Sequence, residues 1–285
     1  MIIDSHCHAW DHWPYQPAVP DPESRGRVEQ LLHEMEANRI DQAAIVCAQI
    51  DHNPENNAYV AEQVRRYPDR LHQIADLDSE WSTNYHQPGA ADRLRQMAEK
   101  WPIAGFTHYL TRDEDGSWLY SEEGQALFRA AAQLKLIASL SCYPHQHSAI
   151  QKAAELFPEV PILCHHLGLV RQGSGALQEN LAQVLSSARL PSIYLKVSGF
   201  AYAALVKWEY PYPDVHWIVK AEYEHFGPRR LCWGSDYPVV RFYMTYRQAL
   251  EAFRTHCTFV PAEDQRWILG ETLGQLLVRA RNGEV

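Results

Sequence analysis

The chain has 285 residues, a formal net charge of −9, and 46% hydrophobic and 21% charged residues. This composition excludes a disordered chain, and the scattered Lys and Arg residues exclude a basic surface for nucleic acid. No apolar run reaches the roughly 18 residues of a membrane span, and no signal-like segment opens the chain, so we expect a cytoplasmic protein with no membrane association.

Strand-like apolar runs alternate with amphipathic segments along the chain. We predict eight strands, at residues 2–8, 41–49, 71–77, 103–110, 135–143, 160–166, 192–200 and 229–237. Helical spacing of apolar residues is present at 28–40, 56–67, 124–134 and 148–157, and a last helix is expected at 262–281. Pro68, Pro102 and Pro158 follow such segments closely, where a helix must stop.

Eight mostly apolar strands that alternate with helices are typical of a parallel sheet, and this length fits a (β/α)₈ TIM barrel. The competing arrangement, a doubly wound open sheet, normally carries a Gly-rich turn after its first strand, and HAWDHWPYQP is not one. No repeat, low-complexity tract or linker divides the chain, so we predict a single domain over residues 1–285. The Pro- and aromatic-rich stretches 10–22 and 208–213 are expected to be loops over one end of the barrel.

Six cysteines, none in a CxxC pair, lie mostly inside apolar runs. Buried, reduced thiols are the expected state of such residues.

Polar side chains recur at the C-terminal ends of the predicted strands, where TIM barrels carry their chemistry. Buried polar groups are costly unless they are paired, so this recurrence indicates one shared site. In chain order the candidates are His6, His8, Gln49, Asp76 or Asp78, His108, Ser141 or Cys142, His165, His166, Lys196 and Asp236.

The strongest signal combines His6-x-His8 with Asp236. Residues two apart on a strand share a face, and the first and eighth strands are neighbours in a closed barrel. Two imidazoles and a carboxylate can form a divalent-metal site, with Asp236 accepting a proton from an attacking water. The alternative is a His/Asp cluster that only satisfies its own hydrogen bonds at the rim of the barrel.

Two further candidates lie on strands six and seven. In VPILCHHLG the consecutive histidines are expected to face opposite ways, one into the barrel mouth and the other toward the helices; His166 is our candidate for a catalytic role. Lys196, inside the apolar run IYLKVSG, is compatible with a catalytic base, a Schiff-base nucleophile, a carboxylate binder or a structural ion-pair partner.

Four residues after strands one, four and eight are candidates for substrate contact: Trp10, His108, Arg112 and Tyr237. Aromatic and cationic groups at the mouth of a barrel suit a ring-shaped or acidic substrate. A solvated loop position is the alternative for each of them.

The chain resembles the amidohydrolase superfamily, specifically its amidohydrolase-2 branch of metal-dependent hydrolases. The matching stretches are IIDSHCHAW, RRYPDRLHQIADLD, VPILCHHLG, IYLKVSGF, FGPRRLCWGSDYPV and WILGETLGQLL. KVSG and GSDYPV look most like the group of sugar lactonases and pyrone-dicarboxylate lactonase, which open cyclic lactones to hydroxy acids. The same branch contains nonoxidative decarboxylases of aromatic or unsaturated acids.

Several positions depart from the pattern of these relatives. Strand five ends in SLSCY without the usual metal-binding histidine, and strand four lacks the lysine or carboxylate that supports a second metal. His165 stands where relatives often have aspartate, and Gly105-Phe106-Thr107 replaces Gly-x-Arg, so Arg112 is the candidate substitute for the anion-binding arginine. The common Gly-Asn of the closing segment is Gly270-Glu271. The resemblance therefore implies at most one divalent ion, Zn or Mn, and no organic cofactor.

Our leading hypothesis is a hydrolase of a small lactone or related ester. Asp236 would activate water. His6, His8 and His166 would polarise the carbonyl group, and Lys196 would assist them. If one metal ion is bound, His6, His8 and Asp236 would hold it. A metal-dependent decarboxylase is the alternative enzyme, and a barrel that binds a ligand without turnover is the non-enzymatic one. The expected partner is a small molecule with carboxylate or hydroxyl groups, and the many aromatic residues suit a homo-oligomer.

Overall fold

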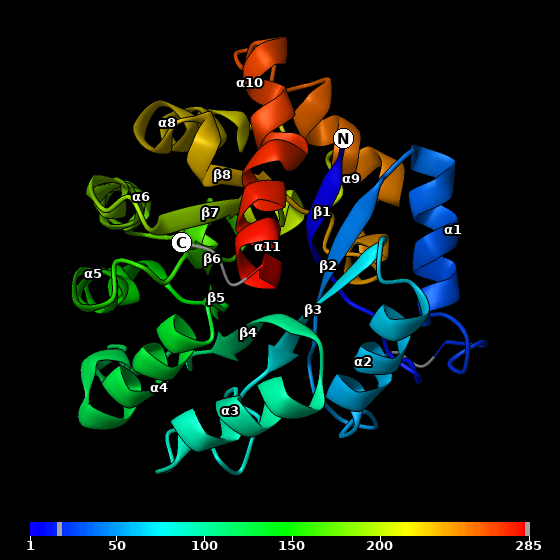
Figure 1. Ribbon diagram of the computed structural model, residues 1–285. Coiled ribbons are helices and arrows are strands. Elements are labelled where there is room, and N and C mark those ends of the chain that lie inside the picture. The colour runs from blue at the N-terminus through cyan, green and yellow to red at the C-terminus, as the bar shows by residue number, and fades with distance from the viewer. Residues whose placement is uncertain (16–18, 283–285) are drawn as a thin grey trace.

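Eight parallel strands form a single sheet whose order follows the chain, from β1 to β8, in a computed structural model that describes residues 1–15 and 19–282 (Figure 1). This confirms the predicted (β/α)₈ barrel and excludes the doubly wound sheet. The strands are β1 (Ile3–Cys7), β2 (Gln42–Val46), β3 (Leu71–Asp76), β4 (Ile103–Tyr109), β5 (Ile137–Ser141), β6 (Ile162–Cys164), β7 (Ile193–Val197) and β8 (Leu231–Trp233).

The barrel closes between β1 and the segment that follows β8. The His8 backbone N–H donates to the Tyr237 carbonyl at 2.6 Å, and the Asp236 N–H donates to the His6 carbonyl at 2.7 Å. Cys7 and Tyr237 form the corresponding parallel bridge. Closure therefore occurs at the same residues that the sequence marks as chemical candidates.

Helices surround the barrel, and each strand is short and buried because both of its faces are covered. They are α1 (Val28–Asn38), α2 (Asn56–Arg66), α3 (Ala90–Lys100), α4 (Glu122–Gln133), α5 (His147–Leu156), α6 (Leu177–Ser186), the short α7 (Phe200–Ala203), α8 (His216–Phe226), α9 (Tyr246–Arg254), α10 (Ala262–Arg266) and α11 (Thr272–Asn282). No helix in the described part of the chain combines the length and the apolar character needed to cross a membrane.

The last helical segment differs from the single helix predicted for 262–281. A π-helical turn, Trp267–Glu271, separates α10 from α11. Gly270 lies in this turn, where a Cβ would come within 2.6 Å of the Met1 carbonyl oxygen. The close approach of this turn to the start of the chain thus requires glycine.

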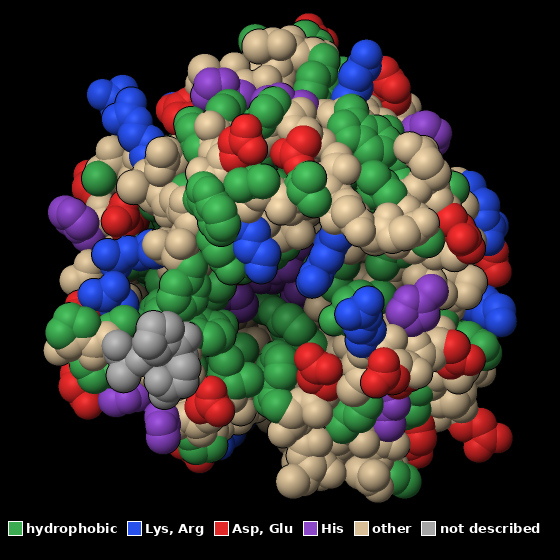
Figure 2. Space-filling model, turned by 180° about the vertical axis from the view of Figure 1, so that it is seen from behind, with side chains coloured by type: hydrophobic (Ala, Val, Ile, Leu, Met, Phe, Trp, Pro, Cys, Tyr) green, Lys and Arg blue, Asp and Glu red, His purple; other side chains and the backbone are tan. Residues whose placement is uncertain are grey.

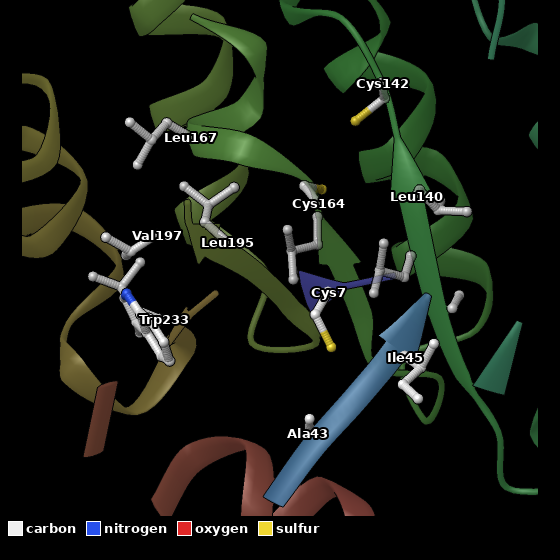
Figure 3. Packing of buried hydrophobic residues seen from close by; sticks show 14 of the residues in the cluster. Cys7, Ala43, Ile45, Leu140, Cys142, Cys164, Leu167, Leu195, Val197 and Trp233 are labelled. Atoms are coloured by element: carbon white, nitrogen blue, oxygen red, sulfur yellow. The ribbon is translucent and has the colours of Figure 1, made fainter. Parts of the chain in front are cut away.

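Apolar residues form two layers. The larger layer fills the space between the strands and the surrounding helices (Figure 3). The smaller one lies inside the barrel, where Ile3, Ile74 and Leu163 pack with Leu273 and Leu276 of α11. Because α11 lies across this end of the barrel in Figure 1, the opposite end is left for polar groups.

The loop expectations hold where the structure describes the chain. Residues 10–15 and 19–22 contain no helix or strand, while 16–18 lie outside the described residues, and 208–213 contain only turns. All six cysteines are free and buried, as predicted.

Candidate functional site

His6 and His8 lie together at the end of β1, as their spacing predicts. Their Nε2 atoms are 3.2 Å apart, and both side chains are buried. The register of β1 against β2 shifts between Asp4 and Cys7. The Asp4 carboxylate is held by the His6 and Ser235 N–H groups, by the Ser235 hydroxyl and by Tyr246, and so anchors β1 to the segment after β8.

The ring of His8 has a defined orientation. Its Nδ1 lies 2.6 Å from the Val46 carbonyl oxygen, and a carbonyl can only accept, so Nδ1 carries a proton. Nε2 faces Asp236, and it offers a lone pair when the ring is neutral and donates when the ring is protonated. Trp10 is fully buried and stacks on the His8 ring, with centroids 5.0 Å apart. The structure thus places Trp10 behind His8, and substrate contact by Trp10 stays a prediction.

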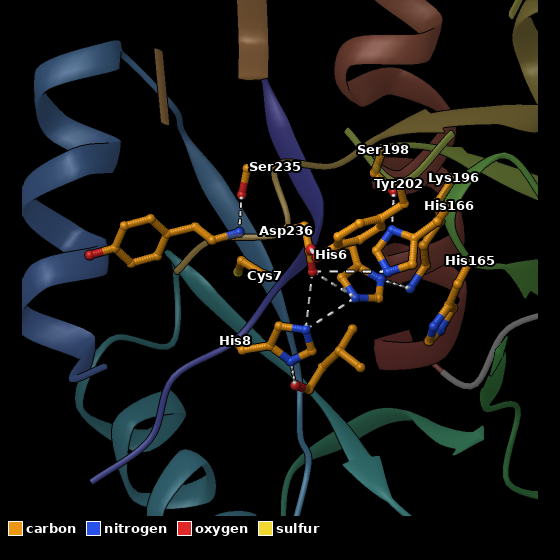
Figure 4. Close-up of polar contacts among 12 residues, drawn as sticks. His6, Cys7, His8, His165, His166, Lys196, Ser198, Tyr202, Ser235 and Asp236 are labelled. Carbon is orange, nitrogen blue, oxygen red and sulfur yellow. Dashed lines mark hydrogen bonds and ion pairs between the residues drawn. The ribbon is translucent and has the colours of Figure 1, made fainter. Parts of the chain in front are cut away.

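Asp236 stands beside both histidines, which confirms that the first and eighth strands bring them together (Figure 4). Its Oδ1 lies 3.3 Å from His8 Nε2, 3.6 Å from His6 Nε2 and 3.9 Å from His166 Nε2. Its Oδ2 accepts a hydrogen bond from the hydroxyl of Tyr202. One carboxylate oxygen therefore faces three imidazoles while a phenol holds the other.

The expectation that His165 and His166 face opposite ways is wrong. One ring nitrogen of each lies in a single cluster with one of His6, all three atoms within 4.8 Å of one another. The reason is that β6 ends at Cys164 and the four residues His166–Leu169 adopt left-handed backbone angles, so strand alternation no longer applies. His166 Nδ1 contacts the Ser198 hydroxyl at 3.0 Å, which leaves Nε2 toward Asp236.

Lys196 is fully buried behind His6. Its Nζ lies 3.1 Å from His6 Nδ1 and 2.7 Å from the Ser139 hydroxyl, which in turn lies 2.7 Å from His165 Nε2. Ser139 lies on β5 and links Lys196 and His165. The contacts of Lys196 make it a positioning residue for His6.

Burial sets the charges of this cluster. Desolvation lowers the pKa of His6 and of His165 well below the ordinary value, and it lowers the pKa of His166 to about 4 against the opposing charge of Asp236. Desolvation also raises the pKa of Asp236, but the charges of His166 and His8 and hydrogen bonds from His8 and Tyr202 outweigh it and hold that pKa below its usual value. The pKa of Lys196 falls to about 7, mainly through desolvation.

These residues fit a divalent metal ion. Nitrogen and oxygen ligands at about 2.0–2.2 Å from one tetrahedral ion lie about 3.3–3.6 Å from each other. The three separations among His6 Nε2, His8 Nε2 and Asp236 Oδ1 are 3.2, 3.3 and 3.6 Å. A divalent ion requires deprotonated ligands, and an ionised carboxylate with neutral imidazoles meets this requirement.

Tyr237 and Arg112 are also predicted to contact the substrate. The Tyr237 ring is fully buried and packs against Tyr246 in the outer core, and its predicted substrate contact stays a prediction. Arg112 is exposed, with its guanidinium 5.9 Å from the centroid of the Tyr143 ring, and it forms no ion pair with another described residue. A substrate role for Arg112 stays a prediction.

His108 belongs to a separate polar and aromatic group near the end of β4. Its Nε2 lies 3.3 Å from His86 Nε2, and its Nδ1 lies 2.9 Å from the Leu77 carbonyl oxygen. His86 stacks on Trp118, and its Nδ1 is 3.4 Å from a carboxylate oxygen of Glu114. The neighbouring residue Tyr109, not His108, contacts His165 of the main cluster.

Sequence reasoning missed Tyr202 and Ser198 as site residues. Both lie in the segment KVSGFAY, which leaves strand seven and in which Gly199 has a positive φ of 70° directly before the short helix α7. A glycine shortly after a barrel strand indicates such a turn, but it does not show which of the following side chains points into the site.

A hollow on the face opposite to that of Figure 1 leads to histidine side chains at its floor (Figure 2). Hydrophobic side chains form much of its wall, and Lys or Arg side chains stand at its edge. The hollow is the kind of recess in which a small organic molecule can bind.

Comparisons with known proteins agree with this geometry. A probable 2-pyrone-4,6-dicarboxylic acid hydrolase from Acinetobacter baumannii, solved with citric acid bound, is 20% identical with a TM-score of 0.75, over 97% of this chain and 99% of its own. An amidohydrolase from Burkholderia multivorans with bound Zn is 19% identical, also with a TM-score of 0.75, over 98% and 99%. A 2,6-dihydroxybenzoate decarboxylase from Rhizobium is 12% identical with a TM-score of 0.70, over 97% and 98%.

At these identities the likeness establishes the fold, which hydrolases and a decarboxylase share. The family profile for amidohydrolase-2 proteins, described as Amidohydrolase, matches residues 3–272. The chain belongs to the amidohydrolase-2 family.

Proposed function

We propose that this protein hydrolyses a small cyclic ester, with Asp236 as the base that activates water. The observation that carries this proposal is the position of Asp236 Oδ1, which faces His8, His6 and His166 within 3.9 Å while Tyr202 holds Oδ2. Its lowered pKa keeps the carboxylate ionised at neutral pH, so it is in the form that accepts a proton.

The reaction assigned to these groups balances without a further reactant. A water oxygen bonds to the lactone carbonyl carbon while Asp236 Oδ1 takes one of its protons. The ring C–O bond then breaks, and the leaving oxygen receives the proton that Asp236 carries. The product is a hydroxy acid, which loses its acid proton to solvent, and Asp236 is again a carboxylate.

His166 stabilises the negative charge that develops on the carbonyl oxygen, by donating from its Nε2. His166 is fixed by Ser198 at Nδ1, so its Nε2 is directed toward this region. His6, His8 and Asp236 are the residues that would hold a divalent metal ion, consistent with their separations. Such an ion, when bound, acts as a Lewis acid on the carbonyl oxygen and on water.

The substrate class follows from the surroundings of Asp236. Tyr15 and Tyr109 lie near Asp236. Burial raises the pKa of each hydroxyl, and the negative charge of Asp236 raises it further. Aromatic side chains suit a flat substrate ring. Arg112 is exposed and forms no ion pair with a described residue, so its guanidinium can bind a carboxylate of the substrate. We therefore propose a carboxylated or hydroxylated lactone, the type of substrate that the Acinetobacter baumannii relative is named for.

Nonoxidative decarboxylation of an aromatic or unsaturated acid is the second candidate. The same aromatic walls favour it, and the metal donor set is suited to hold a carboxylate together with an adjacent hydroxyl. In that reaction Asp236 would deliver a proton to the ring carbon that loses carbon dioxide.

A screen of lactones with a pH indicator, with and without a chelator, tests the proposal. The panel includes 2-pyrone-4,6-dicarboxylate, sugar lactones and simple aliphatic lactones, and Asp236→Asn serves as the inactive control. Acid release by the wild-type protein alone supports lactone hydrolysis. Absence of acid release together with carbon dioxide release from hydroxybenzoates would establish the decarboxylase instead.

A further inference from the structure

A second cluster of metal-binding side chains lies outside the site described above. Cys142 follows β5, Cys164 ends β6 and His147 begins α5, and their donor atoms all lie within 4.8 Å of one another. All three side chains are fully buried. Figure 3 shows Cys142 and Cys164 in the outer core, on adjacent strands of the barrel.

His147 is oriented as metal-binding histidines are. Its Nδ1 lies 2.9 Å from the Ser187 hydroxyl, and its Nε2 lies 3.8 Å from Cys142 Sγ. Gln151 donates to the same Ser187 oxygen at 3.1 Å, which fixes that oxygen in place. A ligating histidine normally has its second ring nitrogen held in this way by an outer group.

The spacing of the donors fits one ion. With about 2.3 Å from metal to sulfur and about 2.0–2.1 Å from metal to nitrogen, a sulfur and a nitrogen ligand of one tetrahedral ion lie about 3.5–3.6 Å apart. The distance between Cys142 Sγ and His147 Nε2 is 3.8 Å, which is within about 0.3 Å of this separation. No rearrangement of strands is needed to bring these two donors to a shared ion.

We propose that Cys142, His147 and Cys164 form a binding site for a thiophilic metal ion of the Zn²⁺ or Cu⁺ class. Two thiolates and one imidazole are soft donors that select such ions over Mg²⁺, Ca²⁺ or Mn²⁺. On binding, each cysteine releases its thiol proton to solvent and no oxidant or reductant takes part. Zn²⁺ with two thiolates gives a neutral complex, which suits a pocket closed to water.

The site has a structural consequence for the candidate active site. Cys164 is followed directly by His165 and His166, both of which contact His6. An ion held by Cys164 would fix the end of β6 and hence the start of the left-handed turn that directs both imidazoles. This role does not depend on which reaction the active site catalyses.

Cobalt substitution tests the proposal, because Co²⁺ bound by thiolate gives a near-ultraviolet charge-transfer band and Co²⁺ bound only by nitrogen and oxygen does not. The protein is produced in cobalt-supplemented medium under reducing conditions, so that the ion can enter during folding. We expect the band in the wild-type protein and in His8→Ala, in which the His6, His8 and Asp236 donor set is incomplete. We expect its loss in Cys142→Ser and in Cys164→Ser.

Cys257→Ser is the matched control and should keep the band, since Cys257 is a buried thiol whose one hydrogen bond within the described part of the chain goes to the Ala252 carbonyl oxygen. Elemental analysis of His8→Ala, produced without added metal, then distinguishes zinc from copper. Absence of the band from folded, reduced wild-type protein, or a band that survives Cys142→Ser, would overturn the proposal. If the serine variants do not fold, the wild-type and His8→Ala spectra still decide it, whatever the outcome of the lactone screen.

Discussion

Lys196 Nζ lies 3.1 Å from Nδ1 of His6, so a cation-forming side chain stands directly behind a candidate metal ligand. For His6 to offer its Nε2 lone pair, its proton must be on Nδ1, and Lys196 must then accept it as a neutral amine. The burial that lowers the pKa of Lys196 to about 7 makes this neutral form accessible near physiological pH. Lys196 thus controls which nitrogen of His6 carries the proton.

Lys196→Met should weaken metal binding and turnover while the barrel still folds. Methionine has a similar volume but cannot accept from His6 Nδ1, and loss of an outer partner of a metal ligand typically costs about 10–100-fold in affinity or activity. Metal titration and kcat on the lactone identified by the screen measure the effect. Lys152→Met, at an exposed position, is the control and should behave as wild type.

Asp236→Asn should lower kcat by about 10²–10⁴-fold, the usual contribution of a general base. The amide keeps the shape of the side chain but cannot take a proton from water. Circular dichroism should remain that of the wild-type protein. Asp78→Asn, whose carboxylate pairs with Arg93, is the matched control, and near-normal turnover by Asp236→Asn would contradict the proposed role.

Tyr202→Phe should move the acid limb of the pH–rate profile upward. The Tyr202 hydroxyl donates to Asp236 Oδ2 and is one of the groups that lower its pKa. The base acts only when ionised, so activity falls as pH drops through that pKa, and loss of one charge-assisted hydrogen bond should raise the midpoint by about one pH unit. Profiles of kcat/KM measure the shift, and Tyr243→Phe, on a ring 6.0 Å away, should show none.

Glu222→Gln should make stability less sensitive to high pH. Glu222 is buried in α8, neither carboxyl oxygen has a hydrogen-bond partner among the described residues, and burial raises its pKa well above 4.5. A raised folded-state pKa adds stability that is fully present below the unfolded pKa and is lost as pH rises toward the folded one, at about 1.4 kcal/mol per pH unit. Wild type should lose this stability as pH rises from about 4.5 toward the folded-state pKa, and the variant should not.

Urea unfolding of wild type and Glu222→Gln across this pH range measures the difference. Glu224→Gln, at an exposed position on the same helix, should follow the wild-type curve. If the free energy of unfolding depends on pH in the same way for Glu222→Gln and wild type, the Glu222 carboxyl is not buried in its protonated form.

Gly168→Ala should destabilise the protein more than Gly89→Ala does. Both glycines have left-handed backbone angles, with φ of 58° and 90°, so a side chain costs about 1–2 kcal/mol at either. At Gly168 the new Cβ would also collide, at 2.7 Å from a methyl carbon of Val184, which adds about 1–3 kcal/mol, whereas at Gly89 it would meet only the end of the flexible Arg93 side chain. Thermal unfolding measures the difference, and equal losses would show that the turn relaxes without strain.

The sequence predicted the barrel well because the physics involved is periodic. Apolar runs buried on both faces identify parallel strands, and closure of eight such strands then places the end of β1 beside the end of β8. The nearness of His6 and His8 to the chain that follows β8 follows from these two facts. The position of Asp236 itself, which lies beyond Trp233 with a φ of 61°, depends on the loop after the strand.

Prediction failed where the backbone leaves the regular strand. His165 and His166 share a site because a left-handed turn begins directly after β6, and strand alternation cannot anticipate it. At β4 the register shifts near Gly105, so that Tyr109 rather than His108 reaches the main cluster. Tyr202 comes from a short helix after β7, and its direction depends on tertiary packing that no local pattern encodes.

Closure of the barrel at Cys7 and Tyr237 has a consequence for how the protein matures. The imidazoles of β1 are synthesised some 230 residues before their carboxylate partner. A nascent or truncated chain that ends before Asp236 holds two unpaired histidines and no base, so it can neither assemble the donor set nor turn over substrate. Two fragments divided between β4 and β5 should accordingly be inert alone and regain activity on mixing only if they rejoin as one barrel.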